Sequence, residues 1–321
     1  MRDPTWPFAD SASPPDPSEP LARVLKLGAD LAHVPFRIMS GFALPFRADI
    51  ERTVRRSFGI AQEPRPRAND PNDAFVDPRS VVRRVHSDLG PMMIGGFAAL
   101  MLQALHPLAM AGVAEHSQYE ADPIGRLRRT ADFVGTTTFG TMEEAREAIA
   151  RVKAIHQRVH GVAPDGRSYS ANDPELLTWV HSAEVYCFLA ANQRFGAQAL
   201  SRSECDSYYR DWAHVALELG ARWVPTDSEE MEAYLLRIRR DLCGGPQAIS
   251  ARDFLIRGVG AGVQDRAIHS LIIAAAIGIL PGWARDELRL RNLGPVEPTV
   301  ISPLARAFCG ALRWALPPKP S

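Results

Sequence analysis

The chain has 321 residues, of which 46% are hydrophobic, so it is long and apolar enough for one large core or two small ones. Lysine and arginine together number 37, as do aspartate and glutamate, and the formal net charge is zero. This balance argues against a nucleic-acid-binding protein, which usually carries a basic excess.

The N-terminus and the cysteines bear on where the protein resides. The first residues are rich in proline, aspartate and serine and contain no apolar stretch of the kind found in a secretory signal. We expect residues 1–20 to form a disordered arm, followed by N-terminal helices and a loop over residues 21–78. The four cysteines are far apart and form no Cys-x-x-Cys pair, so a structural zinc site is not expected. The expected location is a reducing compartment, the cytoplasm.

The rest of the chain reads as almost entirely helical, because alternating runs of β-branched residues are nearly absent. Residues 77–80 (DPRS) are expected to open the first helix of a main domain over residues 79–294, with a C-terminal extension over residues 295–321. Two apolar stretches, residues 92–110 and 267–280, are too short or too interrupted by polar residues to cross a membrane. The sequence therefore predicts an all-α fold, a single large helical domain with these stretches in its core.

An arginine-rich segment, residues 125–130 (GRLRRT), opens a helix that is expected to start near Pro123. Arg126, Arg129 and Thr130 are three and four residues apart, so one side of this helix presents two guanidinium groups and a hydroxyl. Such groups suit propionates, phosphates or a bound oxygen species. The same spacing also fits a solvated helix face, which is the more common reading of an arginine run.

The clearest helix spans residues 141–160. Thr141 and Glu144 form a capping box at its start, and Gly161 is expected to end it. Residues at steps of three and four share its apolar face: Ala145, Ile149, Val152, His156 and Val159. His156 is therefore expected to point toward the core. A lone histidine on such a face is usually a hydrogen-bonded core residue, but a helix-borne histidine is also the usual axial ligand of non-covalent haem b.

Two other histidines lie in or beside expected helices. His106 precedes Pro107, which is expected to end the first apolar helix, so its ring would serve as a cap or in a buried hydrogen bond. His181 lies in a helix expected over residues 174–191, and a further helix is expected over residues 204–219.

Several other chemistries find little support in the sequence. His156 and His160 are one helical turn apart and could chelate a metal, but the glutamate that the zincin pattern requires is replaced by Gln157. The chain has no Gly-x-Ser-x-Gly elbow, no Gly-x-Gly-x-x-Gly fingerprint and no Walker loop. It also lacks the Cys-x-x-Cys-His sequence that attaches haem covalently.

Several segments occur in the order found in one known family. They read RRVHSDLG from Arg83, LQALHP from Leu102, GVAEHS from Gly112, DPIGRLRRT from Asp122, RVKAIHQRVHG from Arg151 and YSANDPELLTWVH from Tyr169. On these segments the chain, from Val82 to Leu290, resembles the latex-clearing-protein (rubber oxygenase) and MpaB-type oxygenase domain.

The resemblance implies an all-helical fold that encloses a pocket for non-covalent haem b. His156 matches the family's proximal histidine, and Arg126 and Thr130 match its distal arginine and threonine. The distal lysine of the rubber-cleaving enzymes is Arg129 here, and because arginine stays charged it cannot donate a proton as lysine does. A second departure is His160, which replaces an arginine of the family's proximal helix.

Together these observations predict a haem-b-dependent oxygenase or oxidase that acts on an apolar small molecule with dioxygen or peroxide. Arg126, Arg129 and Thr130 are the expected catalytic residues, and His156 is the expected iron ligand. Contacts to the cofactor are expected from Arg126, His160, His181, His106 and His156. The alternatives are a haem-binding or haem-sensing protein without turnover, and a helical scaffold without a cofactor. No nucleic-acid partner and no transmembrane segment are expected, and the sequence leaves a homodimer open.

Overall fold

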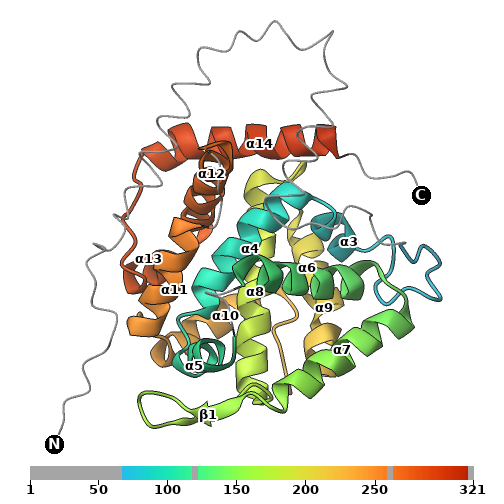
Figure 1. Cartoon of the computed structure of the whole chain (residues 1–321). Coiled ribbons are helices and arrows are strands. Elements are labelled where there is room, and N and C mark those ends of the chain that lie inside the picture. The colour runs from blue at the N-terminus through green and yellow to red at the C-terminus, as the bar shows by residue number, and fades with distance from the viewer. Residues whose placement is uncertain (1–66, 118–121, 259–262, 317–321) are drawn as a thin grey trace, which may run out of the picture.

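The computed structural model describes residues 67–117, 122–258 and 263–316 (Figure 1). The N-terminal arm expected over residues 1–20, and most of the region expected over residues 21–78, lie outside them. Within the described residues the regular structure is helical apart from one short two-stranded sheet, which confirms the all-α prediction.

The helices before the hairpin are α3 (Val81–His86), α4 (Leu89–Gln103), α5 (Pro107–His116), α6 (Pro123–Phe139) and α7 (Met142–His156). The hairpin consists of β1 (His160–Val162) and β2 (Ser168–Ser170). The elements that follow are α8 (Pro174–Phe195), α9 (Arg202–Leu219), α10 (Ser228–Ile238), η2 (Arg239–Asp241), α11 (Pro246–Arg257), α12 (Val263–Ile279), α13 (Gly282–Glu287), η3 (Glu297–Ile301) and α14 (Ser302–Ala315).

The centre of the molecule is the pair formed by α4 and α8, with α12 packed on the other side of α4 (Figure 1). The two helices approach closely at Gly95, where an added Cβ would lie 2.9 Å from the carbonyl oxygen of Cys187 and 3.0 Å from the Cα of Phe188. A larger residue there would push α4 and α8 apart. The two apolar stretches of the sequence are therefore core helices, as predicted.

Among the described residues, no single helix is long and apolar enough to cross a membrane. The helices α4 and α5 reach that length only together, and they bend by 105° at the break between them. The bend follows from Pro107, which cannot continue the hydrogen bonding of α4 and begins α5 instead.

Local signals set most helix starts where the sequence places them. Ser80 accepts a hydrogen bond from the backbone of Arg83 and caps α3, and Asp122 caps α6 through the backbone of Gly125. The capping box of Thr141 is present at α7. The helix expected over residues 204–219 begins earlier, at Arg202, because Ser201 provides its cap, and the helix expected over residues 174–191 continues to Phe195.

The end of α7 differs from the prediction. The helix ends at His156, and His160 lies in β1, where it pairs with Ser170 of β2. The chain turns back through Asp165 and Gly166, and Gly166 adopts a φ of +85° that suits glycine. The backbone of residues 160–162 therefore bonds to β2 instead of to α7. Gly161, expected as the helix stop, is a strand residue, and the one-turn spacing of His156 and His160 is not realised.

The C-terminal helix α14 crosses one end of the molecule and packs on α4 (Figure 1). An added Cβ at Gly90 would lie 2.6 Å from the Sγ of Cys309, so the two helices are in close contact there. Arg313 donates a hydrogen bond to Asp88 over 2.8 Å. These contacts join α14 to the start of α4.

Candidate functional site

The arginine-rich start of α6 places its three predicted residues differently. Arg126 is half-buried, and its Nη1 donates a hydrogen bond of 2.6 Å to the Oγ of Ser117 at the end of α5. Arg129 is exposed and forms an ion pair of 3.1 Å with Asp122. Thr130 is exposed, and its hydroxyl donates to the backbone oxygen of Arg126 over 3.2 Å. Arg126 is therefore the one of the three that a neighbouring helix holds in place.

His156 is the last residue of α7 and is half-buried. Its Nδ1 is buried and has no hydrogen-bond partner among the residues that the structure describes. Burial lowers the pKa of His156, so the ring is neutral at pH 7. A neutral imidazole with a bare nitrogen is the form that binds a metal ion.

The helix α5 contacts both the segment that follows His156 and the start of α6, where Arg126 lies. An added Cβ at Gly112 would lie 3.5 Å from the Cγ1 of Val159, three residues after His156. Five residues after Gly112, at the C-terminal end of α5, Ser117 accepts the hydrogen bond from Arg126. The helices α6 and α7 are adjacent where α6 ends and α7 begins, and they diverge from there toward the start of α6 and the end of α7 (Figure 1).

Three polar side chains that the sequence analysis did not single out join α5 to β2 through hydrogen bonds. Tyr169 donates to the carboxylate of Glu115, and the Nε2 of His116 lies 3.1 Å from the Tyr169 hydroxyl. Burial and the neighbouring Glu115 raise the pKa of Tyr169 to about 12. The signal was present in the sequence, because Glu115, His116 and Ser117 lie in one family-like segment and Tyr169 begins another.

The other histidines proposed for the cofactor lie in different environments. His181 is buried on α8 with no partner for its Nε2 in the described part of the chain, and burial together with the neighbouring His214 lowers its pKa to about 3. His106 precedes α5, is buried, and has no partner for its Nδ1 there. Burial also lowers the pKa of His106. His160 is exposed on the hairpin.

The residues described contain no group of three or more histidine, cysteine, aspartate or glutamate side chains able to hold a metal ion. Haem would need no such group, because one histidine side chain is enough to hold it. A neutral histidine with a bare, buried nitrogen fits that requirement, and among the described residues His106, His156, His181 and His214 each have such a nitrogen. His156 therefore fits the cofactor that the resemblance implies, as the donor of one bond.

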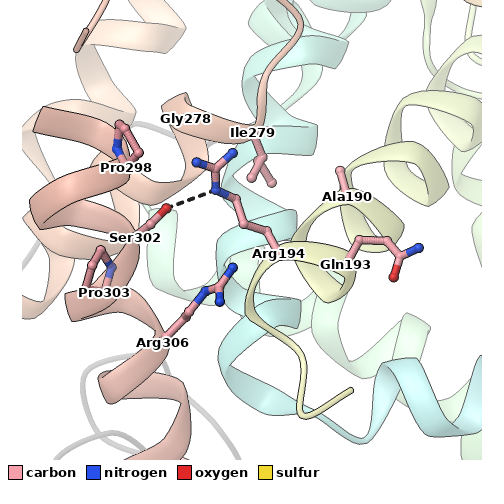
Figure 2. Close-up of a pocket in the computed structure, with 9 residues that line it drawn as sticks. All are labelled: Ala190, Gln193, Arg194, Gly278, Ile279, Pro298, Ser302, Pro303 and Arg306. Carbon is pink, nitrogen blue, oxygen red and sulfur yellow. Dashed lines mark hydrogen bonds between the residues drawn. The ribbon is translucent and has the colours of Figure 1, made fainter. Parts of the chain in front are cut away.

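None of the predicted site residues lines either of two pockets that described residues form. One has a volume of about 790 Å3 and lies among α8, α12, η3 and α14 (Figure 2). The other has a volume of about 680 Å3 and includes Asp211 and His214 of α9. The helix α4 packs in the core between α8 and α12.

The described residues thus form an all-helical fold in which several buried histidine nitrogens, that of His156 among them, have no hydrogen-bond partner. Over residues 83–314 the chain matches the family described as ER-bound oxygenase mpaB/B'/Rubber oxygenase, catalytic domain. The match covers more than half of the chain, so the chain belongs to this family and is an oxidoreductase. No curated protein and no solved structure matches the chain significantly.

The matched range begins within α3 and ends within α14, so it extends beyond Leu290, where the resemblance seen in the sequence ends. It contains Arg126, Thr130 and His156. Membership in a family of oxygenase catalytic domains favours turnover over the two alternatives, haem sensing and a scaffold without a cofactor.

Proposed function

We propose that this oxygenase domain binds haem b through His156 and oxidises an apolar small molecule with dioxygen or peroxide. The observation that carries the proposal is the buried, unpartnered Nδ1 of His156 at the end of α7. A buried polar atom without a partner is costly, and a ligand that completes it removes that cost. Haem supplies, when bound, the iron centre at which the oxidant reacts.

Arg126 is proposed to stabilise negative charge on the oxidant or the substrate. Its hydrogen bond to Ser117 fixes the guanidinium before any ligand arrives, and preorganised donors are effective because they need no rearrangement during the reaction. Thr130 holds the carbonyl of Arg126 and can accept a further hydrogen bond at its hydroxyl oxygen.

Arg129 is proposed to contribute a permanent positive charge, because arginine does not release its proton at neutral pH. It is exposed and paired with Asp122. A lysine at this position could donate a proton and an arginine does not, which supports a small-molecule substrate in place of rubber. A cytoplasmic location is also proposed, since the four cysteines are all free and three of them are buried.

The test measures bound haem in two matched variants of the full chain expressed with haem supplied. His156→Ala is expected to lose the Soret absorption and the pyridine haemochrome signal, because the residue that would hold the haem iron is removed. His160→Ala is the control and should keep both, because that side chain is exposed on the hairpin. Haem retained in His156→Ala and lost in His160→Ala would move the ligand to the hairpin and contradict the proposal.

A further inference from the structure

The pocket of about 790 Å3 among α8, α12, η3 and α14 lies apart from the site above. Arg194, which lines it, comes thirteen residues after His181 on α8, so the two lie roughly 20 Å apart along the helix. The volume falls in the range of about 300–1,000 Å3 that is usual for small-molecule sites. Apolar side chains form part of its lining: Ala190, Ile279, Pro298 and Pro303.

Two arginines enter this pocket from different helices. Figure 2 shows Arg194 of α8 and Arg306 of α14 extending into the same space. Arg194 donates from Nε to the Oγ of Ser302 over 2.9 Å and from Nη2 to Glu297 over 2.5 Å. Its Nη1 has no such bond within the described ranges. Arg306 is exposed and forms no hydrogen bond or ion pair with any residue described.

The carboxylate of Glu297 accepts hydrogen bonds with both of its oxygens. Glu297 accepts from Arg194 with one oxygen and from the hydroxyl of Ser302 with the other, over 2.9 Å. Gly278 allows this packing, since an added Cβ there would lie 2.9 Å from the Oε1 of Glu297. Glu297 begins the π-helical turn η3, a rare and wide turn that is frequent at functional sites.

The charges and the unused hydrogen-bond donors of the pocket indicate which kind of ligand it would bind. Arg194 and Arg306 carry two positive charges and Glu297 carries one negative charge, so one positive charge is left uncompensated. The unused donors belong to guanidinium groups, which bind planar carboxylates with paired hydrogen bonds. One residual charge matches a monoanion better than a phosphate dianion, and the apolar lining suits a hydrocarbon chain.

We propose that the pocket formed by Arg194, Arg306, Ile279 and Pro303 binds a monoanionic carboxylate that carries an apolar chain. This site is separate from the one that holds His156. The carboxylate bonds to Arg306 and to the free Nη1 of Arg194, and the chain lies along the apolar lining. Because Arg306 is exposed, the affinity falls as the salt concentration rises.

The experiment titrates the full-length protein with decanoate, below its micelle concentration, by isothermal calorimetry. One binding site is expected, and decan-1-ol should bind at least ~10-fold more weakly because it cannot accept charge-assisted hydrogen bonds. Arg306→Gln should weaken decanoate binding by a similar factor without changing the unfolding transition. Arg306→Lys should retain part of the affinity.

Arg240→Gln is the matched control, because Arg240 is an exposed arginine on η2 outside the pocket lining. Unchanged decanoate affinity in Arg306→Gln, or equal binding of decan-1-ol, would overturn the proposal. Tighter binding of decyl phosphate than of decanoate would contradict the monoanion assignment. His156→Ala should bind decanoate normally, which separates the outcome from that of the haem proposal.

Discussion

The helices α3 and α7 each end in a histidine, and the two histidines differ in their hydrogen-bond partners. His86 of α3 is buried, its Nδ1 lies 2.7 Å from the hydroxyl of Thr138, and its Nε2 lies 3.0 Å from that of Tyr208. The ring also packs edge-on against Trp212. His156 of α7 has a buried Nδ1 without a partner among the described residues.

Electrostatics alone does not separate the two histidines. Burial lowers the pKa of His86 to about 3 and also lowers the pKa of His156, so both rings are neutral at pH 7. The hydrogen-bond partners make the difference. A ring with both nitrogens bonded holds core helices together, whereas a neutral ring with a bare nitrogen is available to a ligand.

The largest expected effect is on stability at His86. His86→Leu would leave the buried hydroxyls of Thr138 and Tyr208 without their partner, and each unpaired buried group costs about 1–3 kcal/mol. The free energy of unfolding should therefore fall by roughly 2–6 kcal/mol. Urea unfolding followed by circular dichroism measures it. His156→Leu, as the matched variant without haem, should lose less than about 1 kcal/mol.

A smaller loss at His86 than at His156 would reverse the comparison and make His156 the structural residue.

The second expected effect is on rate. Arg126→Ala should keep haem and lower turnover about 100–1000-fold, since removal of one preorganised donor typically has that effect. Arg128→Ala, an exposed arginine of the same helix, is the control and should stay near the parent rate. Oxygen consumption with candidate apolar substrates gives the rates. If Arg126→Ala unfolded or lost haem, its bond to Ser117 would be structural.

The third and smallest expected effect concerns pH. The folded pKa of His86, about 3, lies below its ordinary value of 6.5, so the unfolded chain takes up a proton that the folded chain does not. The stability contributed by this group is fully present above pH 6.5 and is lost as pH falls from 6.5 toward 3. At pH 5 the loss is roughly 2 kcal/mol, at 1.36 kcal/mol per pH unit.

Urea midpoints between pH 7 and pH 4 measure this slope. His181, whose pKa is also lowered to about 3, contributes in the same direction. His86→Leu should remove its own share and flatten the curve. An identical slope in parent and variant would mean that the burial of His86 does not govern the acid response.

Part of the candidate site was readable from the sequence because its signals are short. The helix start near Pro123, the capping box of Thr141 and the apolar steps that lead to His156 each span a few residues of one helix. The family-like segments named Arg126, Thr130 and His156 directly. The hairpin that ends α7 was missed, although Asp165-Gly166 is a turn signal, because two three-residue strands carry almost no pattern.

The sequence by itself determined the all-α class, the core helices α4 and α12, and the family to which the chain belongs. Tertiary structure alone decided which polar groups have partners. His86 and Tyr208 are 122 residues apart, and Arg194 and Glu297 are 103 residues apart. Helix periodicity and capping depend on neighbours within one or two turns, and so they can be read along the chain. Whether a buried nitrogen or a guanidinium has a partner depends on helices that meet only after folding, so the sequence could not show that the Nδ1 of His156 and the guanidinium of Arg306 lack one among the described residues.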